Sequence, residues 1–406
     1  MLGSVWAFLF GLLVIVGLAG DFPVFVALGG MGLLVACGAW LWSRLAIDEL
    51  VFLRTLSQER AFAGDEIILS VTLTNRKPLP LAWVRLFDSL PPGLEILDRS
   101  VEWDPKEMVQ SMVHRTSLGS YERVRWVYRV RCVKRGLFQL GPASLHTGDP
   151  FGFFPRRIDL PQQESILVYP KTIPLPNLFV PARWPVGDRH SVLPLNSDPL
   201  RPAGVRSYQS GDPMKSIDWK ATARRMALQV KIYEPGASVV AVPVVNVDTV
   251  GVSYGGSIPH HLERVVSVAA SLTQEALSRG LNVGLITNGK SSLYDHPMSV
   301  SPGRSRYQLD LIFEALAMVS AYVGSAIEEQ LLLASRRLPR GTSLILITGI
   351  VTVGLRQALQ VLLREGKAPS VIWVADFEPQ GIPVGIECQN LAEYLALCER
   401  DDASLN

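Results

Sequence analysis

The sequence predicts a multi-domain chain that combines a transmembrane helical hairpin (1–43), a β-sandwich (50–169), a proline-rich connector (170–237) and an α/β Rossmann-like domain (238–406). Three patterns support this prediction. Two apolar runs open the chain, residues of alternating polarity follow, and buried strands then alternate with amphipathic helices. Of the 406 residues, 48% are hydrophobic and 19% charged, which is too apolar for a disordered or wholly water-soluble chain.

The first segment contains one charged side chain, Asp21, between the apolar stretches Leu2–Gly20 and Val24–Trp42. Each stretch approaches the roughly 20 residues that span a bilayer core. We therefore expect two spans in contact with membrane lipid, with Pro23 at the turn between them. A cleaved signal peptide is the alternative, but no Lys or Arg precedes the first run and a second run follows directly.

The charges that flank the two spans predict their orientation. No Lys or Arg lies in the turn, whereas Arg44, Arg54 and Arg60 follow the second stretch, so the positive-inside rule places both chain ends in the cytoplasm. We expect an inner-membrane protein with cytoplasmic soluble domains. The three glycines within Gly29–Gly32 could let helices approach closely. Glycine is common in such spans, however, and we favour the interpretation that these glycines have no special role.

Alternation with a period of two marks the strands of the second segment. Ile67–Thr74 alternates apolar and hydroxyl side chains before a turn. Short strands with proline-rich turns predict an antiparallel sandwich. Further strands are expected at Ala82–Phe87, Arg123–Val133 and Gly136–Leu140.

Four arginines share one face of the strand 123–133. They are Arg123, Arg125, Arg129 and Arg131. Such a stripe could hold anionic lipid headgroups, but a solvated outer face explains it equally simply, and we favour that reading.

The connector contains the most unusual composition of the chain, at Gly204–Arg225. Asp212 followed by Pro213 suits a helix N-cap and first helical position, and a strand Ala227–Tyr233 should follow. The charged residues around Trp219 predict either a buried or interfacial polar lattice, or a docking surface for a partner. The residues assigned to this site are Arg206, Tyr208, Gly211, Asp212, Asp218, Trp219 and Arg224.

An enzyme that acts on cell-envelope precursors at the membrane face is the alternative function. It would use the carboxylates of Asp212 and Asp218 with Arg206 and Arg224. No His, Cys or Gly-rich phosphate loop accompanies these residues, so we predict no catalytic residue and no enzyme activity.

In the last segment, Val239–Asp248 and Leu281–Thr287 are expected as buried strands on either side of a helix, Pro259–Arg279. Further helices are expected at Leu309–Val319, Ile327–Arg336 and Leu355–Arg364, and further strands at Ser343–Thr348 and Ser370–Ala375. This alternation predicts a parallel sheet, in which ligands bind at the carboxyl ends of the strands. The positions to inspect there are Asp248, Thr287, Thr348 and Asp376.

Three observations argue against a cofactor or a nucleic-acid partner. The formal net charge is +2, which gives no reason to expect nucleic acid. The adjacent His260 and His261 point about 100° apart on a helix and cannot present the i, i+4 face of a zinc helix, so we expect them at the surface. The four cysteines include no Cys-x-x-Cys pair.

The run GVRSYQSGDPMKSIDWKATARR resembles the defining motif of the bacterial family called domain of unknown function 58, G-x-R-x-Y-x-x-G-D-x-x-R-x-I-x-W-x-x-x-A-R. The matching residues are Gly204, Arg206, Tyr208, Gly211, Asp212, Ile217, Trp219, Ala223 and Arg224. Lys215 stands where an arginine is usual. The resemblance extends over nearly the whole chain. It implies a membrane anchor, a von Willebrand factor type A-like last domain and a MoxR-type AAA+ ATPase as partner.

A type A domain that binds Mg²⁺ places Asp-x-Ser-x-Ser after its first strand. Here Asp248, Val250 and Val252 occupy these places, and valine cannot coordinate a hard cation. We therefore expect a degenerate site without metal, with Asp248 as a loop-capping residue. Together these features predict a membrane-anchored, non-enzymatic adaptor or assembly/chaperone scaffold that acts with the ATPase.

Overall fold

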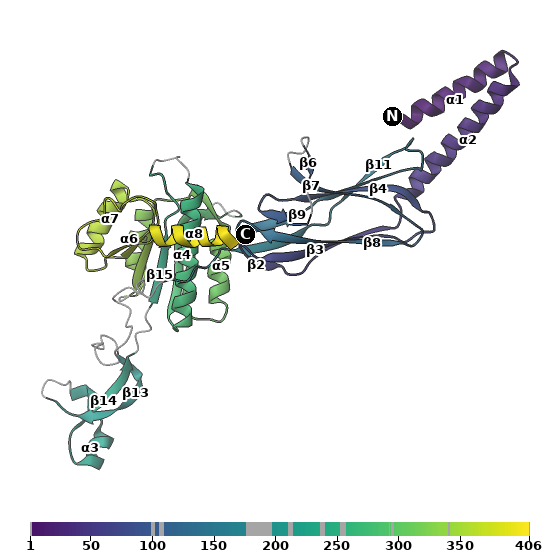
Figure 1. Cartoon of the computed structure of the whole chain (residues 1–406). Helices are drawn as coiled ribbons and strands as arrows, with labels where there is room; N and C mark the ends of the chain where they lie inside the picture. The colour runs from purple at the N-terminus through teal and green to yellow at the C-terminus, as the bar shows by residue number, and fades with distance from the viewer. Residues whose placement is uncertain are drawn as a thin grey trace. The chain divides into compact units, whose positions relative to one another are not determined.

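The computed structural model describes residues 2–98, 102–104, 109–175, 197–209, 214–235, 240–251, 257–291, 293, 296–339 and 342–405. The chain divides into two compact units, Met1–Lys171 and Thr172–Asn406 (Figure 1). The first unit contains apolar helices and β-sheets, and the second contains α/β elements, so the multi-domain prediction is confirmed at this level.

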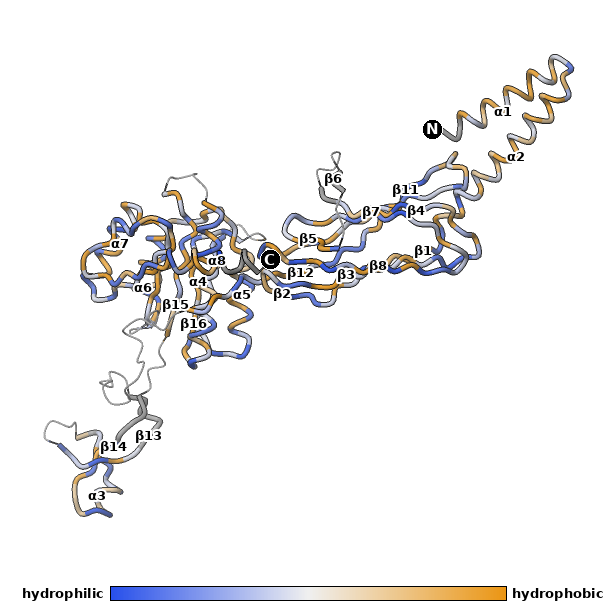
Figure 2. Tube along the Cα trace, in the orientation of Figure 1, coloured by the Kyte–Doolittle hydropathy of each residue, from blue (hydrophilic) through white to orange (hydrophobic). Residues whose placement is uncertain are grey.

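Two apolar helices, α1 (Leu2–Ala19) and α2 (Pro23–Ala46), begin the first unit. Figure 2 shows both as largely hydrophobic, with a hydrophilic turn between them. Among the described residues, α2 is the one helix long and apolar enough to cross a membrane, and the apolar stretch of α1 over Val5–Ala19 is shorter. One of the two predicted spans is thus supported by length and composition.

Gly29 and Gly32 of α2 have the special role that the sequence interpretation disfavoured. A Cβ atom on Gly29 would lie 2.9 Å from the backbone nitrogen of Val14 in α1, and one on Gly32 would overlap the ring of Phe10. At Gly30 a Cβ atom would meet nothing within 4 Å. The two helices therefore approach closely at Gly29 and Gly32, because a side chain there would push them apart.

Two antiparallel sheets follow the helices and share one hydrophobic core. The first has the order β1-β3-β8-β5, with bounds Leu50–Leu56, Glu66–Asn75, Arg123–Cys132 and Leu94–Ile96. The second has the order β11-β10-β4-β7-β6, with bounds Arg156–Leu160, Ala143–Thr147, Leu81–Leu90, Val109–Leu118 and Glu102–Asp104. A smaller sheet joins β2 (Arg60–Phe62), β12 (Glu164–Tyr169) and β9 (Gly136–Leu140). Alternate residues of β3 and β4 are buried in the shared core, as a period of two requires.

The end of α2 is built into this core. Ala46 is buried among the core residues, and Lys77 Nζ donates a 2.7 Å hydrogen bond to its carbonyl oxygen. A lysine at this place satisfies an orphan carbonyl and complements the helix dipole. Because the helix ends in the core, α2 and the sheets form one continuous unit.

The signature segment of the second unit is a two-stranded antiparallel sheet with a short helix. Strand β13 (Ser197–Ser207) pairs with β14 (Gln229–Pro235), and between them lie the 3₁₀ helix η2 (Met214–Ser216) and α3 (Trp219–Arg225). The helix α3 begins at Trp219 with Asp218 as its N-cap, whereas Asp212 and Pro213, predicted as an N-cap and first helical position, lie outside the described residues.

The rest of the second unit is an open sheet in the order β17-β16-β15-β19-β20-β21. The parallel strands are β15 (Val240–Val245), β16 (Asn282–Ser291), β19 (Ser343–Thr348), β20 (Ser370–Trp373) and β21 (Cys388–Asn390). The predicted parallel sheet is therefore present. The antiparallel strands β17 (Pro297–Gly303) and β18 (Val319–Val323), which both pair with β16, were not predicted.

Helices cover this sheet (Figure 1). They are α4 (Pro259–Ser278), α5 (Gln308–Met318), α6 (Ile327–Arg337), α7 (Val353–Arg364) and α8 (Ala392–Leu405). Val240, Val242 and Val244 of β15 pack with buried residues of α6 and α7 in one core cluster. Every residue of β15 is buried, which explains why this strand appears in the sequence as a continuous apolar run.

Candidate functional site

Of the predicted site residues, Arg206, Tyr208, Asp218, Trp219 and Arg224 lie in the described part of the signature segment. Gly211 and Asp212 lie outside the described residues. Arg206 is on β13, where its Nη1 donates a 3.1 Å hydrogen bond to the carbonyl of Ser207. The structure therefore brings the described site residues onto one small element, β13–α3–β14.

Asp218 has a local structural role. Its Oδ1 accepts a 3.0 Å hydrogen bond from the backbone N–H of Ala221, and its own N–H donates to the carbonyl of Gln229 at 2.8 Å. Thr222 Oγ1 accepts a further bond from the N–H of Gln229 at 3.0 Å. These contacts attach α3 to β14, and a capping carboxylate of this kind contributes about 0.5–2 kcal/mol to helix stability.

Trp219 points into solvent rather than into a buried lattice. Its exposed fraction is 66%, and α3 has no buried residue. The buried form of the predicted lattice is therefore wrong for the described residues, because the tryptophan at its centre is not enclosed. A lattice completed by a partner, or a docking surface, remains a prediction.

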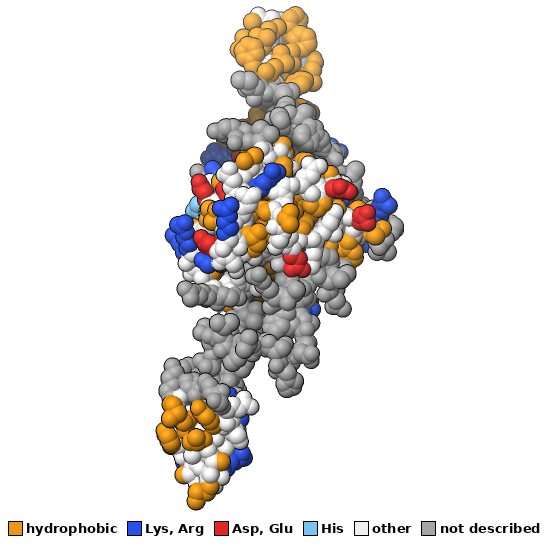
Figure 3. Space-filling model, turned by 90° about the vertical axis from the view of Figure 1, so that its left-hand side faces the viewer, with side chains coloured by type: hydrophobic (Ala, Val, Ile, Leu, Met, Phe, Trp, Pro, Cys, Tyr) orange, Lys and Arg blue, Asp and Glu red, His pale blue; other side chains and the backbone are white. Residues whose placement is uncertain are grey.

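The signature segment exposes several apolar side chains, which we call the signature patch. It consists of Met214, Trp219, Met226 and Leu228, with the exposed cations Lys220, Arg224 and Arg225 beside them. In the lower part of Figure 3, hydrophobic and basic side chains lie next to one another on the described face of this segment. Interface cores favour Trp, Met and Arg, so this composition is typical of a surface that binds protein.

Met226 is held in an uncommon backbone conformation at the end of α3. Its φ is 51° in the left-handed region, and its side chain is 92% exposed. This conformation costs a non-glycine residue roughly 1–2 kcal/mol. Strain of this kind clusters at functional sites, and here it holds an apolar side chain out into solvent.

The carboxyl edge of the large sheet carries a closed polar network. Asn246 Nδ2 donates to Thr348 Oγ1 at 3.0 Å, and its Oδ1 accepts from Asn288 Nδ2 at 2.9 Å. Asn288 Oδ1 accepts in turn from the N–H of Val247 at 2.8 Å. All three side chains are buried, and their bonds join the ends of β15, β16 and β19. This part of the edge is therefore structural.

Asp248 caps a turn near the start of the loop after β15. Its Oδ1 accepts hydrogen bonds from the N–H groups of Val250 and Gly251 at 3.1 and 2.8 Å. This is the turn geometry that a short carboxylate side chain favours. Val250 offers no ligand atom, and Val252 of the predicted degenerate metal site lies outside the described residues.

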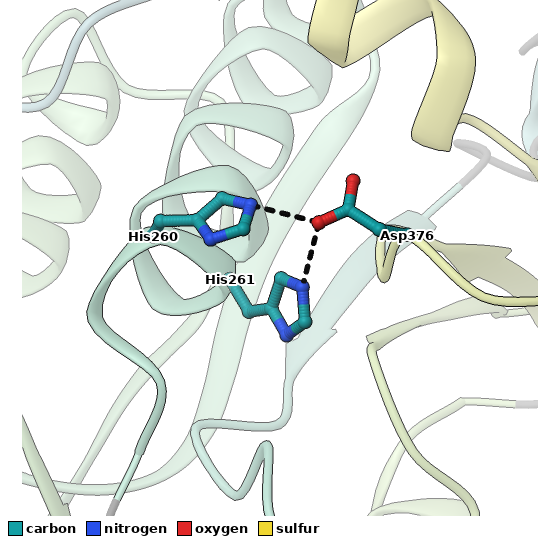
Figure 4. Close-up of side chains that lie close together, drawn as sticks. All are labelled: His260, His261 and Asp376. Atoms are coloured by element: carbon teal, nitrogen blue, oxygen red, sulfur yellow. Dashed lines mark hydrogen bonds and ion pairs between the residues drawn. The ribbon is translucent and has the colours of Figure 1, made fainter.

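Asp376 follows β20 and meets the first turn of α4 (Figure 4). Its Oδ2 lies 3.0 Å from His260 Nε2 and 3.2 Å from His261 Nε2. His260 is exposed, but His261 is only 5% exposed, so the prediction of two surface histidines is wrong for His261. The two ring centroids lie 4.5 Å apart, and both rings reach one carboxylate that comes from another element.

Arg264, one turn further along α4, completes this cluster. Its Nη1 donates to Asp376 Oδ1 at 2.6 Å, and its Nε and Nη2 donate to the two carboxylate oxygens of Glu399 in α8 at 2.7 Å each. The Arg264 bond, and then the His261 contact, hold the pKa of Asp376 below its ordinary value. The signal that sequence reasoning missed is a charged residue within the apolar stripe of α4, where Arg264 is buried.

The ligand atoms of His260, His261 and Asp376 lie within 4.8 Å of one another, as three ligands of a metal ion would. The nearby Arg264 cation opposes a second positive charge, and the carboxylate is already bonded through both oxygens. As it stands, the cluster is best described as an ion-pair network that fixes α4, the end of β20 and α8.

Residues 204–384 match the family model described as "Protein of unknown function DUF58". The chain is also similar to "Uncharacterized protein YeaD" of Bacillus subtilis (strain 168), with 29% identity over 244 residues. The match covers 58% of this chain and 55% of the relative, so the chain spans about half the length of that protein.

Solved structures match only part of the chain, and with low scores. A non-cellulosomal cohesin from Archaeoglobus fulgidus covers 30% of this chain at 12% identity, with 91% of its own length aligned and a TM-score of 0.19. The sporulation control protein Spo0M from Bacillus subtilis covers 30% at 12% identity, with 50% of its own length aligned and a TM-score of 0.17. With scores this low, neither likeness bears on function.

Proposed function

We propose that this protein is a membrane-anchored, non-enzymatic adaptor or assembly scaffold whose signature patch docks a MoxR-type AAA+ ATPase. The observation that carries the proposal is the exposure of Trp219 on a helix without buried residues. The identity of the partner comes from the resemblance of the motif to the domain of unknown function 58 family.

The anchor in this proposal is the helix pair α1 and α2, with both spans in the inner membrane and the soluble parts in the cytoplasm. The length and apolar character of α2 support the anchor. The close approach of α1 and α2 at Gly29 supports their insertion as a pair. The last domain is proposed to be von Willebrand factor type A-like, and its parallel sheet with helices supports this assignment.

An adaptor fits the chemistry of the described residues better than an enzyme. Asp218, one of the two carboxylates that the enzyme alternative needs, is used as a helix cap. The polar side chains Asn246, Asn288 and Thr348 at the sheet edge bond to each other. The signature patch instead offers apolar and cationic groups, which complement an acidic, apolar pocket on a partner.

Co-purification tests the proposal. The full chain is extracted in a mild detergent under conditions that preserve other membrane complexes, and the bound proteins are identified by mass spectrometry. We expect the MoxR-type ATPase to be recovered with the wild-type chain and lost with Trp219→Ala. Repeated recovery of the chain without the ATPase would contradict the proposal.

A further inference from the structure

A row of basic side chains crosses the outward face of four neighbouring strands in the first unit. The strand register pairs His146 of β10 with Arg157 of β11 and with Arg85 of β4, and it pairs Arg85 with Arg115 of β7. Residues paired in this way have Cβ atoms about 4.5–5.5 Å apart, and like charges directly opposite each other destabilise a sheet. An anion bound across the row would offset this repulsion.

An ion pair of the described residues reaches the row at Arg157. Arg157 pairs with Asp159, with Nε and Oδ1 2.9 Å apart. No carboxylate of the described residues pairs with the guanidinium of Arg85, which is exposed. The pKa of His146 is below its ordinary value, first because the ring is partly buried and then because Arg157 and Arg85 are cationic. Both effects favour a neutral imidazole that can still donate a hydrogen bond.

A hollow opens beside Arg85 and His146, and Trp83 and Phe151 form part of its lining. The loop Asp149–Phe154 forms its rim and is held rigidly. Asp149 is buried and accepts hydrogen bonds from the N–H groups of Phe151, Phe153 and Phe154. Trp83 Nε1 donates to the carbonyl of Asp149 at 2.9 Å. The hollow is therefore a preformed feature of the fold.

The same loop lies against the two apolar helices (Figure 1). Ser43 Oγ in α2 donates a 2.6 Å hydrogen bond to the carbonyl of Phe154, and the ring of Trp6 in α1 lies 5.6 Å from that of Phe153. Phe151 at the tip of the loop is 66% exposed. This combination places a cationic hollow and an exposed aromatic ring beside the end of the helix that is long enough to cross a bilayer.

We propose that this hollow binds the phosphate of an anionic glycerophospholipid headgroup, with Arg85 and His146 as hydrogen-bond donors and Phe151 against the start of the acyl chains. The proposal rests on the membrane anchor of the proposed function. A guanidinium suits phosphate because it donates two parallel hydrogen bonds. Phe151 distinguishes a lipid from a free phosphate, which has no apolar part.

Native mass spectrometry of the full chain in detergent tests this site. The chain is titrated with short-chain phosphatidylglycerol, with the matching phosphatidylcholine and with glycerol phosphate. We expect one phosphatidylglycerol to bind with at least about tenfold preference over the other two, and Arg85→Ala to weaken its binding about tenfold, the size of one charge-assisted hydrogen bond. Phe151→Ala should weaken the binding of phosphatidylglycerol but leave the binding of glycerol phosphate unchanged.

Arg123→Ala is the matched control, since Arg123 is an exposed arginine on the outward face of the other sheet. It should bind phosphatidylglycerol as the wild type does. Equal binding by the wild type and Arg85→Ala overturns the proposal, as does equal binding of phosphatidylcholine. Glycerol phosphate binding as tightly as the lipid assigns the hollow to a free phosphate and also overturns it. These outcomes are independent of ATPase recovery, which tests the proposed function separately.

Discussion

Arg54 of β1 and Asp88 of β4 form a fully buried ion pair that joins the two sheets of the first unit. The guanidinium bonds to both carboxylate oxygens, with 3.0 Å between Nε and Oδ2, and its Nη1 donates to the carbonyl of Leu140 at 2.7 Å. Burial raises the pKa of Asp88 to about 6, and Arg54 opposes this rise. Arg54 therefore helps to keep the buried carboxylate of Asp88 charged.

Removing Arg54 should strongly destabilise the first unit. Arg54→Leu leaves a buried carboxylate without its partner, which costs about 3–5 kcal/mol. The double variant Arg54→Leu with Asp88→Leu should recover most of this loss. Without Arg54 to oppose the rise, the pKa of Asp88 lies above about 6, so the loss in Arg54→Leu should shrink as the pH falls toward about 6 and level off below it, where Asp88 is protonated in both proteins. Thermal unfolding of the full chain in detergent measures all three effects, and an unchanged melting temperature in Arg54→Leu would contradict this account.

The close approach of α1 and α2 gives a prediction with an internal control. Gly29→Ala should separate the helices, because its Cβ would meet the backbone of Val14, whereas Gly30→Ala should be neutral. Overpacking of this kind costs roughly 1–3 kcal/mol. Distances between spin labels on α1 and α2, measured in detergent or nanodiscs, should widen in Gly29→Ala only. Equal behaviour of the two variants would mean that the helices do not pack through Gly29.

Asp376 should stabilise the second unit in a pH-dependent way. Its folded pKa lies below the ordinary value of 3.8, so its contribution is present above pH 3.8 and is lost as the pH falls through the folded value. Asp376→Asn should therefore melt at a lower temperature than the wild type at neutral pH, and the difference should shrink below pH 3.8. Glu378→Gln, an exposed neighbour, is the control. A difference that persists unchanged in acid would rule out the ion-pair explanation.

Trp219 should dominate binding of the partner without supporting the fold. A central exposed tryptophan typically contributes 2 kcal/mol or more at an interface, so Trp219→Ala should weaken ATPase binding by about 30-fold or more. Its melting temperature should match the wild type, because α3 has no buried residue. Tyr322→Ala removes an equally exposed aromatic residue outside the signature patch and should bind normally. Titrating surface-immobilised ATPase with the full chain gives the affinities of the wild type and of the two variants.

Local patterns predicted the parts of the fold that depend on local physics. The continuous apolar run at Val240–Val245 and the stripe of α4 predict buried elements wherever the chain packs them. The strand β17 was missed because Pro297 and Gly303 at its ends are typical of turns, and pairing with β16 decides its conformation. The N-cap was placed at Asp212 because Pro213 follows it, whereas Asp218 makes the capping bond.

The candidate sites were predictable only in part, because they depend on contacts between distant residues. Arg54 was counted as a charge flanking the membrane, but its partner Asp88 lies on another sheet. His261 was assigned to the surface because Asp376, which lies 115 residues further along the chain, is not visible in the local sequence. The composition around Trp219 did reveal an unusual segment, while only the structure places that side chain in solvent.

Photo-crosslinking in living cells tests the central claim most directly. A photoreactive phenylalanine analogue replaces Trp219 or, as the control position, Tyr322 in the full chain, and the crosslinked products are identified by mass spectrometry. The account predicts a crosslink to the MoxR-type ATPase from position 219 and none from position 322. Crosslinks from position 219 only to residues of the chain's own α/β domain, without the ATPase, would contradict it.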